Sequence, residues 1–382
     1  MKPSRMIRQL DFPLILLLLV LAIISIVAIS GATHSSNPSY VEQQVVWYLV
    51  GILSLVAVLL FDYRVLMQGR FVYILYGLGI LLLLLVMVPG VGVTVKGAQQ
   101  WLRIGGFQFQ PSELMKLFLI VTLAKVTAEV PTLPIRGWRE IGKVLALFAL
   151  PFILILQQPD LGTALVLIGI AGSILLAAGL DWRIFLAGMM AATLVIGGIL
   201  FLFFTEHPLL RTILADHQIQ RIETFINPAS DPSGAGYQLT QSMIAVGSGQ
   251  LYGKGLHNGT QAQGKWIPEP HNDFIFAVWA EEFGFIGGSI LLCTFIFLVY
   301  RIIQVGINSG DPFGAYIVAG VAGMVVFQVF QNIGMTVGML PITGLPLPFV
   351  SYGGSSLITH MMAMGLVLNV GMRKEGDFLF MD

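Results

Sequence analysis

Residues 12–29 read FPLILLLLVLAIISIVAI, a run of 18 residues without a charged side chain. A membrane-spanning helix needs about 20 predominantly apolar residues, because it must cross a hydrocarbon core about 30 Å thick. Lys2, Arg5 and Arg8 precede this run, as they would in a signal peptide. The run is long enough to span, however, and Thr33-His34-Ser35 is a poor small-residue cleavage site. We therefore expect a retained first transmembrane helix.

The composition of the whole chain agrees with a membrane protein. Of 382 residues, 56% are apolar and 10% are charged, whereas a soluble domain carries about 25% charged residues. The net charge of zero provides no basic surface, so no nucleic-acid partner is expected. Cys293 is the single cysteine, which excludes a disulfide within the chain and a cysteine-based metal site.

Nine further apolar stretches of spanning length follow the first one. The ten candidate spans are residues 12–30, 45–61, 71–88, 112–128, 142–157, 161–179, 183–204, 273–301, 313–338 and 351–371. The sequence therefore predicts an all-α integral membrane protein with about ten transmembrane helices, organised as one polytopic domain over residues 1–382.

The distribution of Lys and Arg predicts the orientation of these spans. With the N-terminus in the cytoplasm, twelve of these residues fall on the cytoplasmic side and six fall outside. Cytoplasmic loops carry an excess of Lys and Arg, so both termini are expected in the cytoplasm.

Three polar regions rich in Gly and Pro then lie on the extracytoplasmic side, at residues 89–111, 205–272 and 339–350. The 68-residue segment 205–272 is the one large loop, and loops of that length are often functional. Its first part, residues 209–226, spaces apolar residues as an amphipathic helix does, and this helix could lie in the outer membrane interface.

Asp273 is the foremost candidate for catalysis. It lies at the outer mouth of the eighth span, directly before Phe274, Ile275 and Phe276. An apolar neighbourhood makes a carboxylate a better proton acceptor, which suits a general base. An Asp at this place could equally cap the helix that follows, and the sequence leaves both interpretations open.

Glu113 and Lys116 lie three residues apart within the fourth span, so they share one helix face. Charged residues inside a membrane usually pair and face a protein interior or a wet cavity. Such a pair can be structural, functional or both. Asp160 follows Gln158-Pro159 at the outer end of the sixth span, where capping is again the simpler alternative.

Three further features are weaker signals. Lys96 and Arg103 flank the first outer loop and could contact an anionic group such as a phosphate, or be solvated loop residues. Ser351 opens the small-residue stretch at the start of the last span, where backbone N–H groups can bind anions. Of Glu281 and Glu282, at least one should face a polar interior or a partner side chain.

Six outer motifs occur in order along residues 10–372. They are Lys96-Gly97-Ala98-Gln99-Gln100-Trp101-Leu102 with Gln110-Pro111-Ser112-Glu113; Gln158-Pro159-Asp160-Leu161-Gly162-Thr163; Asp231-Pro232 with Gly234-Ala235-Gly236-Tyr237-Gln238; Pro268-Glu269 through Asp273-Phe274-Ile275-Phe276-Ala277; Ala280-Glu281-Glu282; and Gly344-Leu345-Pro346-Leu347-Pro348 running into Ser351-Tyr352-Gly353-Gly354-Ser355. Together they resemble the SEDS family, the shape, elongation, division and sporulation proteins. Residues 259–263 resemble the RodA branch, which acts in elongation, more than the FtsW branch.

The resemblance implies a peptidoglycan glycosyltransferase that polymerises lipid II, with undecaprenyl pyrophosphate as the leaving group. Asp273 matches the essential carboxylate of the family and is implied to be the general base. Glu113, Lys116 and Asp160 match polar positions near a central cavity.

The resemblance also implies a divalent cation, Mg or Mn, whose ligands the sequence does not identify. The implied partners are a class B penicillin-binding protein, which is a transpeptidase, and other membrane proteins of the elongation complex. The implied location is the bacterial cytoplasmic (inner) membrane, with the active site on the extracytoplasmic side.

Two alternatives belong to other functional classes. A lipid II flippase would also suit ten helices and the pair Glu113–Lys116, but transport needs polar groups spread across the bilayer. The polar motifs cluster outside, which favours the enzyme. A non-catalytic scaffold for wall synthesis is disfavoured by the amount of polar patterning in the outer loops.

Overall fold

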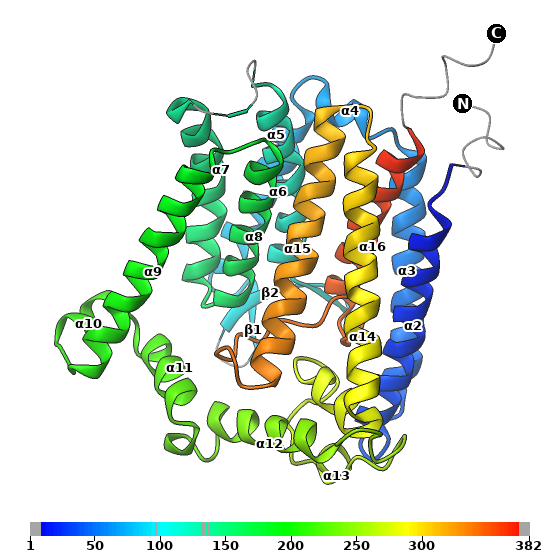
Figure 1. Cartoon of the computed structure of the whole chain (residues 1–382), viewed down its shortest axis with the longest axis vertical. Helices are drawn as coiled ribbons and strands as arrows, with labels where there is room; N and C mark the ends of the chain where they lie inside the picture. The colour runs from blue at the N-terminus through cyan, green and yellow to red at the C-terminus, as the bar shows by residue number, and fades with distance from the viewer. Residues whose placement is uncertain (1–8, 96–97, 131–133, 136, 374–382) are drawn as a thin grey trace.

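The computed structural model describes residues 9–95, 98–130, 134–135 and 137–373. Long, roughly parallel helices form a bundle, and most of the short helices and a small sheet gather at one end of it, which we call the outer end after the orientation predicted from the sequence (Figure 1). Because α2 begins and α16 ends at the opposite end of the bundle, the two ends of the described chain share one side.

Each of the ten predicted spans is a helix in the structure. They are α2 (Phe12–Thr33), α3 (Ser39–Leu60), α5 (Phe71–Met87), α6 (Pro111–Ala128), α7 (Trp138–Gln157), α8 (Leu161–Ala177), α9 (Trp182–Phe204), α14 (Ile275–Ile307), α15 (Pro312–Thr336) and α16 (Gly354–Met372). Among the described residues, seven of these helices are long and apolar enough to cross a membrane, while α5 and α8 are shorter apolar helices. The remaining one, α6, carries three charged residues, and a short helix, α4 (Arg64–Met67), joins α3 to α5.

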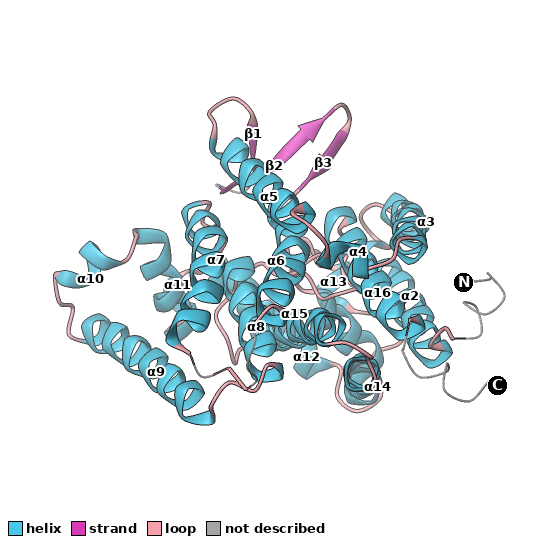
Figure 2. Cartoon of the chain, turned by 90° about the horizontal axis from the view of Figure 1, so that it is seen from above, coloured by secondary structure: helices cyan, strands magenta, loops and turns pink. Residues whose placement is uncertain are grey.

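The centre of the bundle is α15, which packs against α6, α8, α14 and α16. Small residues permit this close approach. A Cβ added to Gly320 would lie 3.0 Å from both Ile120 and Ile174, so the neighbouring helices contact the α15 backbone there. At the other extreme, α9 has no buried residue and stands apart from the bundle (Figure 2).

The sequence predicted an all-α protein and no strand in the polar region 89–111, but this region folds into a three-stranded antiparallel sheet in the order β1-β2-β3. Its strands are β1 (Gly92–Val95), β2 (Ala98–Ile104) and β3 (Phe107–Phe109). Gly105 has φ +62° in the tight turn between β2 and β3, a conformation that Gly adopts without strain. The strands are short and separated by Gly, so the alternation of apolar and polar residues that is typical of a strand was not visible in the hydropathy of the sequence.

The long loop 205–272 consists mainly of short helices that lie across the outer end of the bundle (Figure 1). They are α10 (Leu209–Ile213), α11 (Asp216–Ile226), the 3-10 helix η1 (Pro228–Ser230), α12 (Ala235–Ser248) and α13 (Thr260–Gln263). The single amphipathic helix predicted over residues 209–226 is therefore two helices, because extended backbone at Leu214 and Ala215 separates them.

Two buried carboxylates fasten this loop to the first turns of α14. Glu281 accepts a hydrogen bond from Lys254 Nζ at 2.6 Å, and Glu282 Oε1 accepts one from the His257 backbone N–H at 3.0 Å. Both Glu side chains are fully buried, which confirms that they face partners within the protein. Directly after them, Gly284 adopts φ +64° and kinks the helix. The outer segment of α14, which follows Asp273, is thereby set apart from the rest of that helix.

Candidate active site

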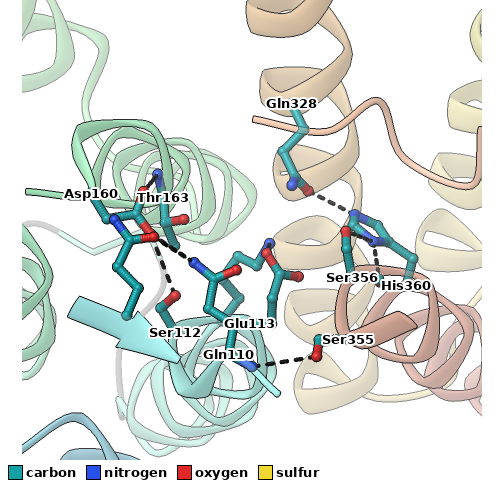
Figure 3. Close-up of polar contacts among 11 residues, drawn as sticks. Gln110, Ser112, Glu113, Asp160, Thr163, Gln328, Ser355, Ser356 and His360 are labelled. Carbon is teal, nitrogen blue, oxygen red and sulfur yellow. Dashed lines mark hydrogen bonds and ion pairs between the residues drawn. The ribbon is translucent and has the colours of Figure 1, made fainter. Parts of the chain in front are cut away.

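Polar side chains from α6, α8, α15 and α16 meet inside the bundle near its outer end. Figure 3 shows Glu113 between two groups, one around Asp160 and the other around His360. Polar groups in such a place need partners from the protein, because lipid supplies none. The hydrogen bonds of this interior therefore define a candidate site.

The centre of the site is the ion pair between Lys116 and Glu113. Lys116 Nζ lies 2.8 Å from Glu113 Oε1, and the two side chains are 0% and 3% exposed. Pro111 occupies the first helical turn of α6, which places Glu113 near the helix N-terminus, where a negative charge is favoured. The shared helix face predicted for these residues is confirmed.

Asp160 both caps a helix and joins the site. Its Oδ1 accepts the Thr163 backbone N–H at 3.0 Å, as expected for the N-cap of α8. Its Oδ2 accepts Gln110 Nε2 at 3.0 Å and Ser112 Oγ at 3.5 Å. Burial raises the pKa of the Asp160 carboxyl above its usual range. The capping interpretation is thus confirmed, while the second oxygen ties α8 to the start of α6.

A second polar group lies on the other side of the ion pair. The fully buried His360 of α16 has Nε2 2.7 Å from Gln328 Oε1 of α15 and Nδ1 2.6 Å from the Ser356 carbonyl oxygen. His360 lies close enough to Glu113 and Lys116 to interact with both charges. Charged residues within the spans were the signal for this site, and His360, a polar residue without a fixed charge, was therefore not among the residues predicted from the sequence.

Asp273 is half-buried at the end of the long loop, directly before α14. The N-cap position of α14 is held by Phe274, whose side chain makes no capping bond. The backbone of Gly344 passes close by, since a Cβ built on it would lie 3.6 Å from Asp273 Oδ2. The carboxylate is therefore placed against the outer segment that follows α15.

That segment also connects Asp273 to the start of α8. A Cβ added to Gly162 would lie 2.7 Å from Leu345 Cγ and 3.1 Å from the Thr343 carbonyl oxygen. The segment 343–345 therefore contacts the first turn of α8, next to Asp160, and also lies beside Asp273.

The remaining predicted site residues have different surroundings. Ser351 is 5% exposed, and its Oγ donates to the Asn272 carbonyl oxygen at 2.7 Å and accepts the Leu347 N–H at 2.8 Å. Arg103 is exposed on β2. Lys96 lies outside the described residues. Contact of these three residues with substrate stays a prediction.

A family model named for FtsW, RodA and SpoVE, and described as a cell cycle protein, matches residues 6–376. The chain belongs to the FtsW/RodA/SpoVE family. The family expected from the six motifs is thereby confirmed, and the protein is a multi-pass membrane protein.

Several relatives of this family member match over nearly the whole chain. Peptidoglycan glycosyltransferase MrdB of Escherichia coli (strain K12) is 38% identical over 363 residues, which are 95% of this chain and 93% of MrdB. A chain in the structure titled "Structural coordination of polymerization and crosslinking by a peptidoglycan synthase complex" has a TM-score of 0.80 at 32% identity, covering 96% of this chain and 99% of that one. The rod shape determining protein RodA of Thermus thermophilus has a TM-score of 0.69 at 32% identity, with coverage of 96% and 98%.

The loop helix α11 adds a cation that the sequence analysis did not assign to the site. Arg221 is partly buried beside Pro159 and Leu161, next to a small cavity. Burial lowers the pKa of the Arg221 guanidinium, and the nearby negative charge of Asp160 opposes this shift. The amphipathic pattern of residues 209–226 indicated the helix but not where its Arg would lie.

The site does not contain a preformed metal centre within the part of the chain that the structure describes. No group of three or more His, Cys, Asp or Glu side chains there could hold a metal ion. Of the two buried carboxylates in the site, Glu113 is paired with Lys116 and Asp160 is held by Thr163 and Gln110. These residues do not fit a resident divalent cation.

We predict that breaking the ion pair costs more than removing both charges. In Lys116→Met, Glu113 is left as an unpaired buried carboxylate, which costs about 3–5 kcal/mol. The double variant Glu113→Gln/Lys116→Met removes both charges of this pair and should unfold closer to the wild type. Thermal unfolding of the detergent-solubilised proteins measures the difference, and equal losses in the single and double variants would contradict it.

We predict that Asp160→Asn and Asp160→Ala differ in stability. Asn still caps α8 and removes a charge that burial penalises, but its Nδ2 cannot accept the bonds that Gln110 and Ser112 donate to Oδ2, so Asp160→Asn should stay near wild-type stability at neutral pH. Asp160→Ala loses the cap and should be less stable by about 1 kcal/mol.

The pH dependence follows from the raised pKa of Asp160 in the folded protein. As pH falls through that pKa, the wild-type carboxyl takes up a proton and its burial penalty disappears. Any stability advantage of Asp160→Asn should therefore shrink at lower pH. Unfolding followed across a pH series measures this, and an advantage that grows on acidification would refute the explanation.

Proposed function

We propose that this protein is a peptidoglycan glycosyltransferase that polymerises lipid II into glycan strands during cell elongation. The observation that carries the proposal is the half-buried Asp273 carboxylate at the outer end of a bundle whose interior holds Glu113, Lys116 and Asp160. MrdB, a relative that matches along nearly the full length, is named a peptidoglycan glycosyltransferase.

The reaction needs a general base and a good leaving group. It needs no nucleotide, because the leaving group comes with the donor. The 4-hydroxyl of the acceptor sugar attacks the anomeric carbon of the donor, and Asp273 takes the hydroxyl proton. The bond from the anomeric carbon to the pyrophosphate oxygen breaks as the new glycosidic bond forms, with inversion. Undecaprenyl pyrophosphate leaves with the electron pair, so the donor itself supplies the energy.

Cationic groups are required where the pyrophosphate charge develops. Lys96 and Arg103 of the first outer loop are proposed contacts, because cations at an outer loop can meet a lipid-linked phosphate. Arg221 is a further proposed contact, supported by its place beside Asp160. Glu113 and Lys116 shape the polar interior in which the sugars are oriented.

A divalent cation, Mg or Mn, would have to arrive with the substrate, because the described residues supply no complete ligand set. Such an ion neutralises charge on a pyrophosphate leaving group. Its ligands would then include pyrophosphate oxygens.

The proposed orientation places both termini in the cytoplasm of a bacterial inner membrane and the site outside. A structural neighbour comes from a complex that, by its title, coordinates polymerisation with crosslinking. A class B penicillin-binding protein, which crosslinks strands, is therefore the proposed partner, and the outer surface of the loop 205–272 is where it would dock. Other membrane proteins of the elongation complex are further proposed partners.

The flippase alternative requires polar groups along a path through the bilayer. Glu113, Asp160, Glu281 and Glu282 instead lie near the outer end of the bundle. Lys125, near the other end of α6, is bonded to the Gly69 carbonyl oxygen at 2.5 Å and lies 3.7 Å from Glu129, so its charge has partners within the protein. This distribution favours chemistry over transport.

We predict that Asp273→Ala abolishes polymerisation without unfolding the protein. Removing a general base lowers rates by about 10²–10⁴-fold. Purified protein, its class B penicillin-binding partner and lipid II are incubated, and glycan strands are resolved on a gel. Asp216→Ala, which removes an exposed carboxylate of the same loop, is the matched control and should remain active. Full-length strands from Asp273→Ala would exclude Asp273 as the base.

A further inference from the structure

Three consecutive backbone carbonyl groups at the site each accept a hydrogen bond from a distant part of the chain. We call the three donors the carbonyl clamp. The bonds run from the Tyr352 N–H to the His271 oxygen (2.9 Å), from Ser351 Oγ to the Asn272 oxygen (2.7 Å), and from Asn332 Nδ2 to the Asp273 oxygen (2.8 Å).

The carbonyl clamp supplies hydrogen-bond donors to three backbone carbonyls that lie just before α14. The Ala277 N–H donates to the Phe274 carbonyl at 3.0 Å, which is where the hydrogen-bond ladder of that helix begins. Carbonyls just before a helix are outside this ladder, and buried backbone groups must find other partners. The carbonyls of residues 271–273 find theirs in α15 and in the turn that precedes α16.

Asn332 is the member of the clamp that acts on Asp273 directly. It is fully buried on α15, and its Nδ2 donates both to the Asp273 oxygen and to the Leu345 oxygen, each at 2.8 Å. Leu345 adjoins Gly344, and a Cβ built on Gly344 would lie 3.6 Å from Asp273 Oδ2. The side-chain amide of Asn332 therefore fixes both the backbone of Asp273 and the backbone of Leu345, which adjoins the glycine beside the carboxylate.

The same helix also carries the polar group around His360. Gln328 lies one turn before Asn332 on α15 and contacts His360 at 2.7 Å. A displacement of Asp273 relative to α15 would thus change its position relative to the interior of the site.

We propose that Asn332 is a positioning residue for Asp273, and that Ser351 supports it from the next peptide group. This inference rests on the proposed function. The side-chain donors of both residues are used inside the protein, so in this role both act through the carboxylate. Loss of either should lower kcat and leave the KM for lipid II unchanged, because misplacing a reacting group by about 1 Å can cost about 100-fold in rate.

The chain offers a matched control for Asn332. Asn369 is 1% exposed on α16, and its Nδ2 likewise donates to two backbone carbonyls, those of Val58 and Phe61. It lies at the other end of the bundle, near the end of the described chain. Asn332→Ala and Asn369→Ala therefore each remove a buried bridge to two carbonyls, one beside Asp273 and one far from it, and Asn369→Ala also removes the acceptor of the bonds from the Tyr63 N–H and Arg373.

The experiment measures kcat and KM for lipid II with the complex of this protein and its transpeptidase partner, below the melting temperature of every variant. We expect Asn332→Ala to lose roughly 10- to 100-fold in kcat with KM within about twofold of wild type. Asn369→Ala should lose a similar amount of thermal stability and keep its kcat within about twofold. Equal losses of kcat in both variants would mean a structural role only and would overturn the proposal.

Ser351 keeps the proposal testable if Asn332→Ala does not fold. Ser351→Ala should lower kcat in the same way, and Ser351→Thr, which retains the hydroxyl, should restore most of it. Wild-type kcat in Ser351→Ala or in Asn332→Ala would overturn the positioning role while an inactive Asp273→Ala still supported the base. An active Asp273→Ala, or a wild type that makes no strands, would remove the base assignment and this inference with it.

Discussion

Lipid tails offer no hydrogen-bond partners, so polar groups within the spanning helices have to be satisfied by other parts of the chain. In this protein the requirement is met most visibly by Lys116 and Glu113, whose charged atoms lie 2.8 Å apart in the interior. The helices that surround the pair are held together by further bonds of the same kind, such as Asp160 with Gln110 and His360 with Gln328. The arrangement of the outer half of the bundle depends on these internal partners.

The outer end is correspondingly more elaborate than the end where the described chain begins and finishes. Short loop helices cover it, and Glu281 and Glu282 fasten them to the first turns of α14. The kink at Gly284 and the clamp on residues 271–273 then hold Asp273 between α15 and the segment that leads to α16. A carboxylate held in this way can be half-exposed to substrate and still have a fixed position.

The spans were predictable because hydropathy acts locally, and each predicted span is a helix, although α3 begins six residues before its expected bound and α14 ends six residues after its own. The pair Glu113–Lys116 was predictable because three residues along a helix define one face. The contacts of Asp273 with Asn332 and of His360 with Gln328 join residues 59 and 32 positions apart, and no local pattern reveals them. Asp160 shows the intermediate case, since its cap was visible in the sequence and its bond to Gln110 was not.

The central claim is that the outer polar site transfers glycosyl groups and does not transport lipid. Detergent micelles have no second leaflet, so transport cannot occur in them, whereas glycosyl transfer can. The most direct measurement therefore incubates the purified complex with lipid II in micelles and follows glycan strands and released undecaprenyl pyrophosphate together. The account predicts strands, with one undecaprenyl pyrophosphate released for each new linkage. No strands in micelles, together with movement of lipid II between the leaflets of vesicles that hold the same protein, would contradict it.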